Sequence, residues 1–469
     1  MARSKTIAVA IFACACLAPN LPAQSADALI NKLLEKGILT EKEAQELKND
    51  VTQTNTPPAS KWKISDAIKS IGLYGDVRFR YEYRAADNVP GSGESGSTYE
   101  RERFRYAVRI GLRGDLFDDF YYGLRIETSS NPRSPWVTFG DDTNPTPSAK
   151  NSDGVNIGQA YLGWRPTDWL DLTVGRMPMP LFVTPMIWDT DINPEGLAEH
   201  LKYSLPKVDL FANFGQFIYQ DANAGNQTVP NEPFILAWQV GANVKLPKDM
   251  TFKFAPVLYS YTGNGQNNGL NLPFTGQGQN GLNPNTSPAY NQNGINDLLV
   301  LETPAEFNFK LGSLPARVFG DFAYNFQGDN RAQAAFVANQ SGVAPLARAY
   351  TQDRKAYQVG LGVGNLGLVS FQTSKRNTWE ARVYWQHVEQ YAADVNLLDS
   401  DFFEGRGNLQ GIYTALAYSI TDSIIAAVRY GYAKRINNNL GTGGNNPDLP
   451  VLNPINNYNL VQVDLGWRF

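Results

Sequence analysis

Sixteen stretches of the chain alternate between apolar and polar residues, and this periodicity restricts the fold most. In the segment 74–84 (YGDVRFRYEYR), one parity is apolar or aromatic from Val77 to Tyr83, and the other is charged. Period-two alternation predicts β-strands with two unlike faces. The predicted strands span 71–84, 101–114, 120–128, 155–165, 169–177, 197–205, 207–218, 234–246, 250–261, 301–311, 314–326, 355–364, 377–389, 409–420, 423–434 and 458–469.

The connections between these strands alternate in length. Those after even-numbered strands are short (LFDDF, PTD, Pro206, PKD, GS, NLG and TD), whereas those after odd-numbered strands are long, the longest running from Tyr261 to Leu301. This sorting is typical of a membrane barrel with two different rims, and a Greek-key sandwich has no reason to show it. The sequence therefore predicts an all-β fold, a transmembrane antiparallel β-barrel of about sixteen strands, between roughly fourteen and eighteen.

The last nine residues, VQVDLGWRF, place apolar side chains at every second position from Val461 to Phe469. A terminal aromatic residue behind such a pattern resembles the last strand of bacterial outer-membrane barrels, where it is an assembly signal. We therefore assign Phe469 as the assembly signal. In such a barrel the aromatic side chains, including Phe79, face lipid and the arginines face a wet lumen.

Four regions follow from the composition along the chain. Residues 1–23 form a secretory signal with a basic start and a short apolar stretch. Residues 24–51 predict a short periplasmic α-helical hairpin of unknown role, with a capping box at Thr40 and Glu43. A polar linker (52–70) leads to the barrel (71–469). Both cysteines lie in the signal, so the mature chain offers no thiolate metal site.

Several function classes find no support. The formal net charge is −4 without a basic stripe, which argues against nucleic acid as a partner. The glycines of GVGNLG (362–367) are not followed by a predicted helix, so no cofactor is expected. The only histidines are His200 and His387, without a G-x-S-x-G motif, so no enzyme is expected. Whether the loop with Asp189 and Asp191 binds calcium stays open.

The segment 169–198 resembles the putative porins of Gram-negative outer membranes, in which a strand ending in Gly-Arg leads into a Trp-Asp-x-Asp-x-Asn-Pro-Glu-Gly loop. The matching residues are Gly175, Arg176, Trp188, Asp189, Asp191, Asn193, Pro194, Glu195 and Gly196. The resemblance implies a general-porin-like barrel in the outer membrane and a homotrimer. Strand parity would turn Arg176 outward, so we expect a bulge or a strand end there.

Inward parity and the resemblance together predict the channel wall. The expected pore-lining residues are Arg78, Arg80, Arg105, Arg109, Arg125, Arg382 and Arg429. The loop from Met177 to Gly196 is expected to fold into the lumen and to bring Asp189, Asp191 and Glu195 against this basic wall. Because few carboxylates face the arginines, we expect a weak anion preference.

The predicted function is passive diffusion of small hydrophilic solutes and ions. The predicted partners are outer-membrane lipid, those solutes, two further copies of the chain and the barrel-assembly machinery. One alternative is a substrate-selective channel for phosphate, an organic acid or a sugar. A more distant one is an outer-membrane enzyme or adhesin with a plugged lumen. The sequence does not identify the solute.

Overall fold

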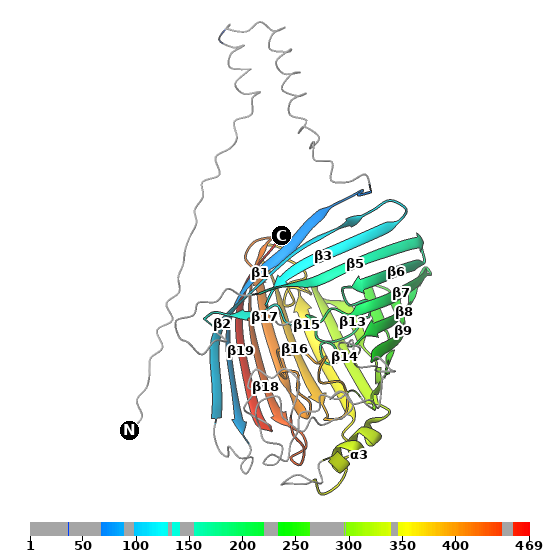
Figure 1. Ribbon diagram of the computed structural model, residues 1–469. Helices are drawn as coiled ribbons and strands as arrows, with labels where there is room; N and C mark the ends of the chain where they lie inside the picture. Colours follow the sequence, from blue (N-terminus) through cyan, green and yellow to red (C-terminus); the bar gives the residue numbers. More distant parts are fainter. Residues whose placement is uncertain are drawn as a thin grey trace. The chain divides into compact units, whose positions relative to one another are not determined.

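The computed structural model describes residues 36, 67–88, 98–129, 134–140, 154–219, 233–262, 295, 297–338, 346–442 and 454–469. The part from Ala67 to Phe469 forms one compact unit and is considered by itself (Figure 1). The predicted signal, nearly all of the predicted hairpin and linker, and most of the long 262–300 connection lie outside the described residues.

The described residues contain one antiparallel sheet of nineteen strands. The strands are β1 (Gly72–Asn88), β2 (Thr98–Asp115), β3 (Phe120–Thr128), β4 (Val137–Thr138), β5 (Val155–Thr167), β6 (Leu170–Arg176), β7 (Glu195–Ser204), β8 (Val208–Ile218), β9 (Phe234–Leu246), β10 (Met250–Phe254), β11 (Val257–Tyr261), β12 (Leu299–Glu302), β13 (Ala305–Leu311), β14 (Leu314–Asn325), β15 (Lys355–Gly364), β16 (Thr378–Val388), β17 (Leu409–Ser419), β18 (Ile424–Arg435) and β19 (Ile455–Arg468).

These segments make sixteen barrel strands, as predicted. Two barrel strands are each divided in two, because Pro256 separates β10 from β11 and Pro304 separates β12 from β13. Proline has no N–H for the ladder, so it interrupts pairing. The two-residue β4 belongs to the connection between β3 and β5 and pairs with β2, so it is not counted as a barrel strand. The structure also contains the helix α3 (Gly328–Ala338), and no helix in the described part is long and apolar enough to cross a membrane.

The barrel is closed, because β1 pairs with β2 on one side and with β19 on the other. Tyr81 lies opposite Val463, and Arg80 lies opposite Asp464. The final residue completes this seam: Phe469 and Gly75 exchange two backbone hydrogen bonds of 3.0 Å. Closure leaves no unpaired sheet edge, which a strand needs in hydrocarbon.

The two faces of the strands divide as predicted. Phe79 is 50% exposed, Phe104 62% and Val428 50%, whereas Arg80 is 4% exposed and Asp464 is 1% exposed. The apolar side chains therefore form the outer surface and the charged ones the interior, the reverse of a soluble sheet. The exposed fractions therefore show which side chains of the alternating strands face outward and which face the barrel interior.

The short connections are tight hairpins with one exception. Asp118 and Asp119 have φ of 57° and 62°, and Lys248 and Asp249 have φ of 62° and 58°, the left-handed geometry that suits the twist of a hairpin. The exception follows β15. The sequence predicted a tight NLG turn there, but β16 begins only at Thr378 and the intervening segment is partly buried, with Leu368 at 0% and Phe371 at 5% exposure. Its apolar side chains need a dry environment, so this turn folds inward.

Candidate functional site

The connection between β6 and β7 lies inside the barrel. Phe182 is held by Gln239 of β9, whose side-chain oxygen accepts the Phe182 N–H at 2.9 Å and whose amide donates to the Phe182 carbonyl at 2.7 Å. Thr184 donates its N–H to Glu302 at 3.1 Å. The side chains of Met177 and Met186 within this connection are fully buried. Residues 177–194, called the β6–β7 loop below, are therefore fixed to the wall at several points.

A second inward connection, which the sequence did not reveal, runs between β16 and β17. Residues 389–408, called the β16–β17 loop, include Tyr391, Phe402 and Arg406, all at most 1% exposed. The two loops are hydrogen-bonded to each other. The Asp189 N–H donates to the Leu397 carbonyl at 2.6 Å, and Asp189 accepts the Ser400 N–H at 3.1 Å and its hydroxyl at 3.0 Å.

The joint between the loops concentrates carboxylates. Burial raises the pKa of Asp399 to about 7, and the neighbouring Asp401 adds to the effect. Burial also raises the pKa of Asp189, reinforced by Asp399 and then Asp191. The pKa of Asp401 is lowered instead: burial opposes this, but the Arg80 and Arg84 guanidinium groups outweigh it. Protonation at Asp399 and Asp189 therefore favours the docked arrangement, since it removes repulsion in a dry setting.

Each arginine predicted to line the pore lies near a carboxylate. The contacts are Arg78 with Asp76 at 2.8 Å, Arg80 with Asp464 at 2.7 Å, Arg105 with Glu82 at 3.7 Å, Arg109 with Asp76 at 3.1 Å, Arg125 with Glu127 at 2.9 Å, Arg382 with Glu380 at 2.8 Å, and Arg429 with Asp464. All seven lie on the inward side of their strands.

The acids predicted for the loop have different surroundings. Asp191 reaches the barrel wall and forms an ion pair with Arg109 at 3.2 Å. Asp189 contacts Ser400 and backbone rather than the arginine wall. Glu195 does not belong to the loop: it begins β7 and forms an ion pair with Arg176 at 2.5 Å, with its side chain 54% exposed. Arg176 is the last residue of β6, at the strand end where the sequence predicted a break in parity.

The structure adds a buried charge cluster at the barrel centre. In the described residues, six arginines share four carboxylates. The arginines are Arg80, Arg84, Arg103, Arg105, Arg406 and Arg429, and the carboxylates are Glu82, Asp401, Glu404 and Asp464. Arg406, Asp401 and Glu404 come from the β16–β17 loop, which explains why strand parity alone missed them.

Two further segments complete the cluster. The Arg80 guanidinium lies 4.0 Å from the centre of the Trp136 ring, which the β4 segment inserts into the barrel. Arg429 donates to the Val369 carbonyl at 2.7 Å in the inward turn after β15. The apolar residues of both segments could have indicated from the sequence that these segments fold inward, because Trp, Phe and Leu side chains are usually buried.

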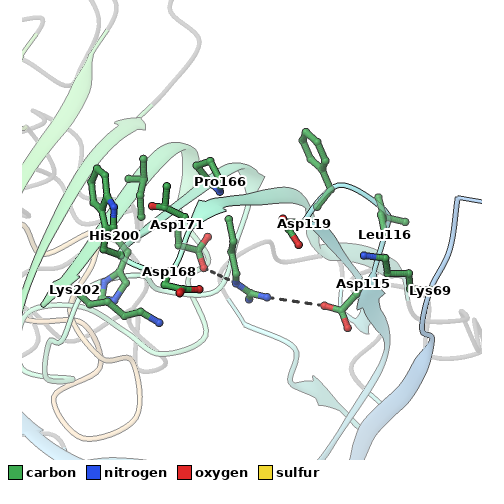
Figure 2. Close-up of a pocket in the computed structure, with 14 residues that line it drawn as sticks. Lys69, Asp115, Leu116, Asp119, Pro166, Asp168, Asp171, His200 and Lys202 are labelled. Carbon is green, nitrogen blue, oxygen red and sulfur yellow. Dashed lines mark hydrogen bonds and ion pairs between the residues drawn. The ribbon is translucent and has the colours of Figure 1, made fainter. Parts of the chain in front are cut away.

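Near the end with the short turns the interior is hollow. A cavity of about 790 Å³ is lined by residues of both charges, among them the labelled Asp115, Asp171, His200 and Lys202 (Figure 2). Arg165 lies 3.0 Å from Asp171 and 3.9 Å from Asp115. A second cavity of about 440 Å³ also includes His200 and Lys202 and extends to the β6–β7 loop. In the ranges given above, no group of three His, Cys, Asp or Glu residues could hold a metal ion.

Comparison with known proteins identifies the family. Residues 87–313 and 313–469 match the sequence model of the family described as putative porin. The chain belongs to the putative porin family. Comparison with curated proteins gives no match. Family and closed barrel together indicate an outer-membrane porin channel rather than an enzyme.

Two solved porins are among the structures to which this chain is similar. A triple mutant of the Rhodopseudomonas blastica porin is 9% identical, with 85% of this chain and 100% of that chain covered and a TM-score of 0.39. An anion-selective porin from Comamonas acidovorans is 8% identical, with coverage of 85% and 99% and a TM-score of 0.44.

Proposed function

We propose that this porin is a passive diffusion channel for small hydrophilic solutes, narrowed at its centre by the β6–β7 and β16–β17 loops. The observation that carries the proposal is the ion pair of 3.2 Å between Asp191 of the loop and Arg109 of the wall. Side chains at the centre are fully buried, as for Glu82 at 0%, whereas Tyr121 and Asp171 toward the short-turn end are partly exposed. This contrast supports a wide vestibule that leads to a narrow region.

The charges of the narrow region support a weak anion preference. The six arginines gathered in the central cluster favour anions, but neighbouring carboxylates compensate most of the field. Opposed charges on the loop and the wall also orient dipolar solutes and disfavour apolar ones. The short-turn end faces the periplasm in this proposal, and the pore-lining role of the seven arginines is part of it.

Single-channel recording in planar bilayers tests the proposal. Conductance should rise in proportion to bulk salt, and the zero-current potential in a salt gradient should show anion preference at about 0.01 M that fades near 1 M, because the Debye length falls from about 30 Å to about 3 Å. Replacing Arg78, Arg105 and Arg109 together by Gln should shift that potential toward cations, and replacing Asp189 and Asp191 by Asn should shift it the other way. An unchanged potential in both variants would show that these side chains lie off the conducting path.

We also propose a homotrimer, which the outer face of β7 and β8 supports. Glu199 shares the parity of the outward Leu197, and Gln216 shares that of the outward Ile218, so their hydrogen bond of 3.1 Å lies on the outer surface. A carboxylate facing hydrocarbon is unfavourable, and a second copy would cover it. Migration of the unheated protein at the trimer mass on semi-native gels tests this. Migration at the monomer mass by both the parent protein and the Glu199→Leu variant would contradict a trimer.

A substrate-selective channel is the main alternative, and the cavity of about 440 Å³ beside the β6–β7 loop favours it. The enzyme or adhesin alternative requires a closed lumen. Absence of any ion conductance from correctly folded protein would support that alternative and refute a diffusion channel.

A further inference from the structure

The cavity of about 440 Å³ lies beside the β6–β7 loop, toward the short turns, and has an unusual lining. Phe182 comes from the loop, Lys202 from β7, Phe211 from β8 and Lys253 from β10. A volume of this order is typical of sites for small organic molecules. The combination of two lysines with two aromatic rings suggests what such a molecule would contain.

Among the described residues, neither lysine ammonium group has a direct ion pair with a carboxylate, although Glu306 interacts electrostatically with Lys253. Throughout the part of the barrel that the structure describes, neither Lys202 nor Lys253 forms a side-chain ion pair. This separates them from the central arginines, each of which has one. Lys253 is half-buried and Lys202 is exposed. Two ammonium groups without a direct ion pair give the cavity a positive potential, which attracts an anion from solution.

The nearby carboxylates are already engaged. Asp209, which also lines the cavity, pairs with Lys245 at 2.8 Å. Glu306, which faces Lys253 in the strand register, pairs with Arg317 at 3.2 Å. Glu306 therefore compensates Lys253 only in part, because it is shared with Arg317, and Asp209 is held by Lys245.

The rings hold one of the two cations in place. The Lys253 Nζ lies 3.7 Å from the centre of the Phe182 ring and 5.3 Å from that of Phe211. Phe211 lies over Gly241 of β9, where a Cβ would come within 2.2 Å of its Cζ atom. Gly241 thus leaves space for the Phe211 ring to lie against the barrel wall. The Lys253 ammonium group lies over the faces of both rings.

A buried hydrogen-bond network fixes the remaining wall. The Gln239 side-chain oxygen accepts the Phe182 N–H at 2.9 Å, so it must also accept the Asn213 amide at 2.7 Å. The Asn213 oxygen therefore points to His200 Nδ1, which must carry the hydrogen. This chain from β7 through β9 to the loop makes the cavity preformed, because its polar groups determine one another's orientation.

We propose that this cavity is a subsite for a small aromatic carboxylate, held by Lys202 and Lys253 through its carboxylate and by Phe182 and Phe211 through its ring. The inference rests on the proposed diffusion channel and names a solute class for it. Ammonium groups bind carboxylates by charge-assisted hydrogen bonds, and aromatic rings favour edge or offset contact with a second ring. An anion that enters by the vestibule would meet this subsite before the narrow region.

Solute block of single-channel current tests the subsite. Benzoate should reduce the potassium chloride current saturably, acetate should do so more weakly, and neutral benzamide should have little effect. The double variant Lys202→Gln, Lys253→Gln should raise the half-blocking benzoate concentration at least about tenfold, as expected for the loss of charged hydrogen bonds. Phe211→Leu should weaken benzoate more than acetate. Lys310→Gln is the matched control, because Lys310 pairs with Asp249 at the rim.

The possible outcomes distinguish failure of the subsite from failure of the proposed diffusion channel. If the parent protein conducts but benzoate block is equal in the parent and the double variant, the subsite is refuted and the diffusion channel stands. Equal block by acetate and benzoate, or stronger block by inorganic phosphate, would refute the aromatic carboxylate class. If the folded parent protein does not conduct at all, the diffusion channel itself is refuted.

Discussion

Asp464 of β19 is the carboxylate on which the central cluster depends most directly. It is 1% exposed and accepts the Arg80 guanidinium through Nε at 2.7 Å and Nη2 at 3.1 Å. It also pairs with Arg429, whose further contact is the Val369 carbonyl. Asp464→Asn keeps the shape of the side chain and removes its charge, so the substitution isolates the electrostatic contribution.

The size of the expected destabilisation depends on which carboxylates Arg80 and Arg429 keep in the Asp464→Asn protein. Removing one partner of a buried ion pair costs about 3–5 kcal/mol, because the other charge stays buried without compensation. Arg80 keeps Asp401 at 2.8 Å, but Arg429 loses its carboxylate. We therefore expect the lower end of that range, about 3 kcal/mol. The free energy of unfolding in urea, measured after folding into lipid vesicles, gives the value.

Two matched variants show whether the reasoning is right. Asp209→Asn breaks an ion pair with Lys245 whose side chains are 32% and 49% exposed, and should cost far less stability than Asp464→Asn, because solvent screens an exposed pair. Adding Arg429→Gln to Asp464→Asn should recover part of the loss, since it removes the stranded cation. Equal stability of the Asp464→Asn and Asp209→Asn proteins would refute a buried, mutually dependent cluster.

Three further outcomes are expected. Val428→Arg, at a position 50% exposed on the outer face of β18, should destabilise the folded barrel by about 2–4 kcal/mol in the same assay, and no loss would contradict its contact with lipid. The pKa of Asp399 is raised from its usual value of 3.8 to about 7. Protonation of Asp399 therefore stabilises loop docking fully below pH 3.8, and this stabilisation is lost as the pH rises to about 7. Conductance should therefore increase between acidic and neutral pH, and Asp399→Asn should abolish that step; a step that persists would assign it to another group. Deleting Phe469 should remove its two hydrogen bonds with Gly75 and prevent assembly; a normal heat-modifiable band in outer membranes would show that the residue is dispensable.

The strands could be predicted because their signal is local. β18 was expected at 423–434 and spans Ile424–Arg435, and β9 was expected at 234–246 and has those bounds. A strand with one face in lipid and one in a polar interior must alternate at every residue, so each segment carries its own evidence. Pro256 and Pro304 were visible in the sequence, and the divisions at these two positions could have been expected because proline has no N–H for the ladder.

The interior could be predicted only in part, because its contacts join distant residues. Parity turned Arg80 inward, but its partner Asp464 is 384 positions away along the chain. The β16–β17 loop was expected only as a long connection. Its segment NLLDSDFF (396–403) was a usable signal, because Leu and Phe in an external loop would remain exposed to water. What the sequence cannot supply is the surface against which such a loop packs.

The distribution of unpaired charge bears on the proposed ion preference. The sequence predicted a basic wall of seven inward arginines with few carboxylates and a weak anion preference. In the structure each of these arginines lies near a carboxylate, so the positive charge of the wall is largely compensated. Lys202 and Lys253 form no such direct ion pair in the described residues, although Glu306 partly compensates Lys253. Two lysines in the vestibule should therefore influence anion entry as much as several paired arginines at the centre. If so, Lys202→Gln with Lys253→Gln will shift the zero-current potential at low salt by at least as much as the triple arginine variant, and a smaller shift would return the anion preference to the central cluster.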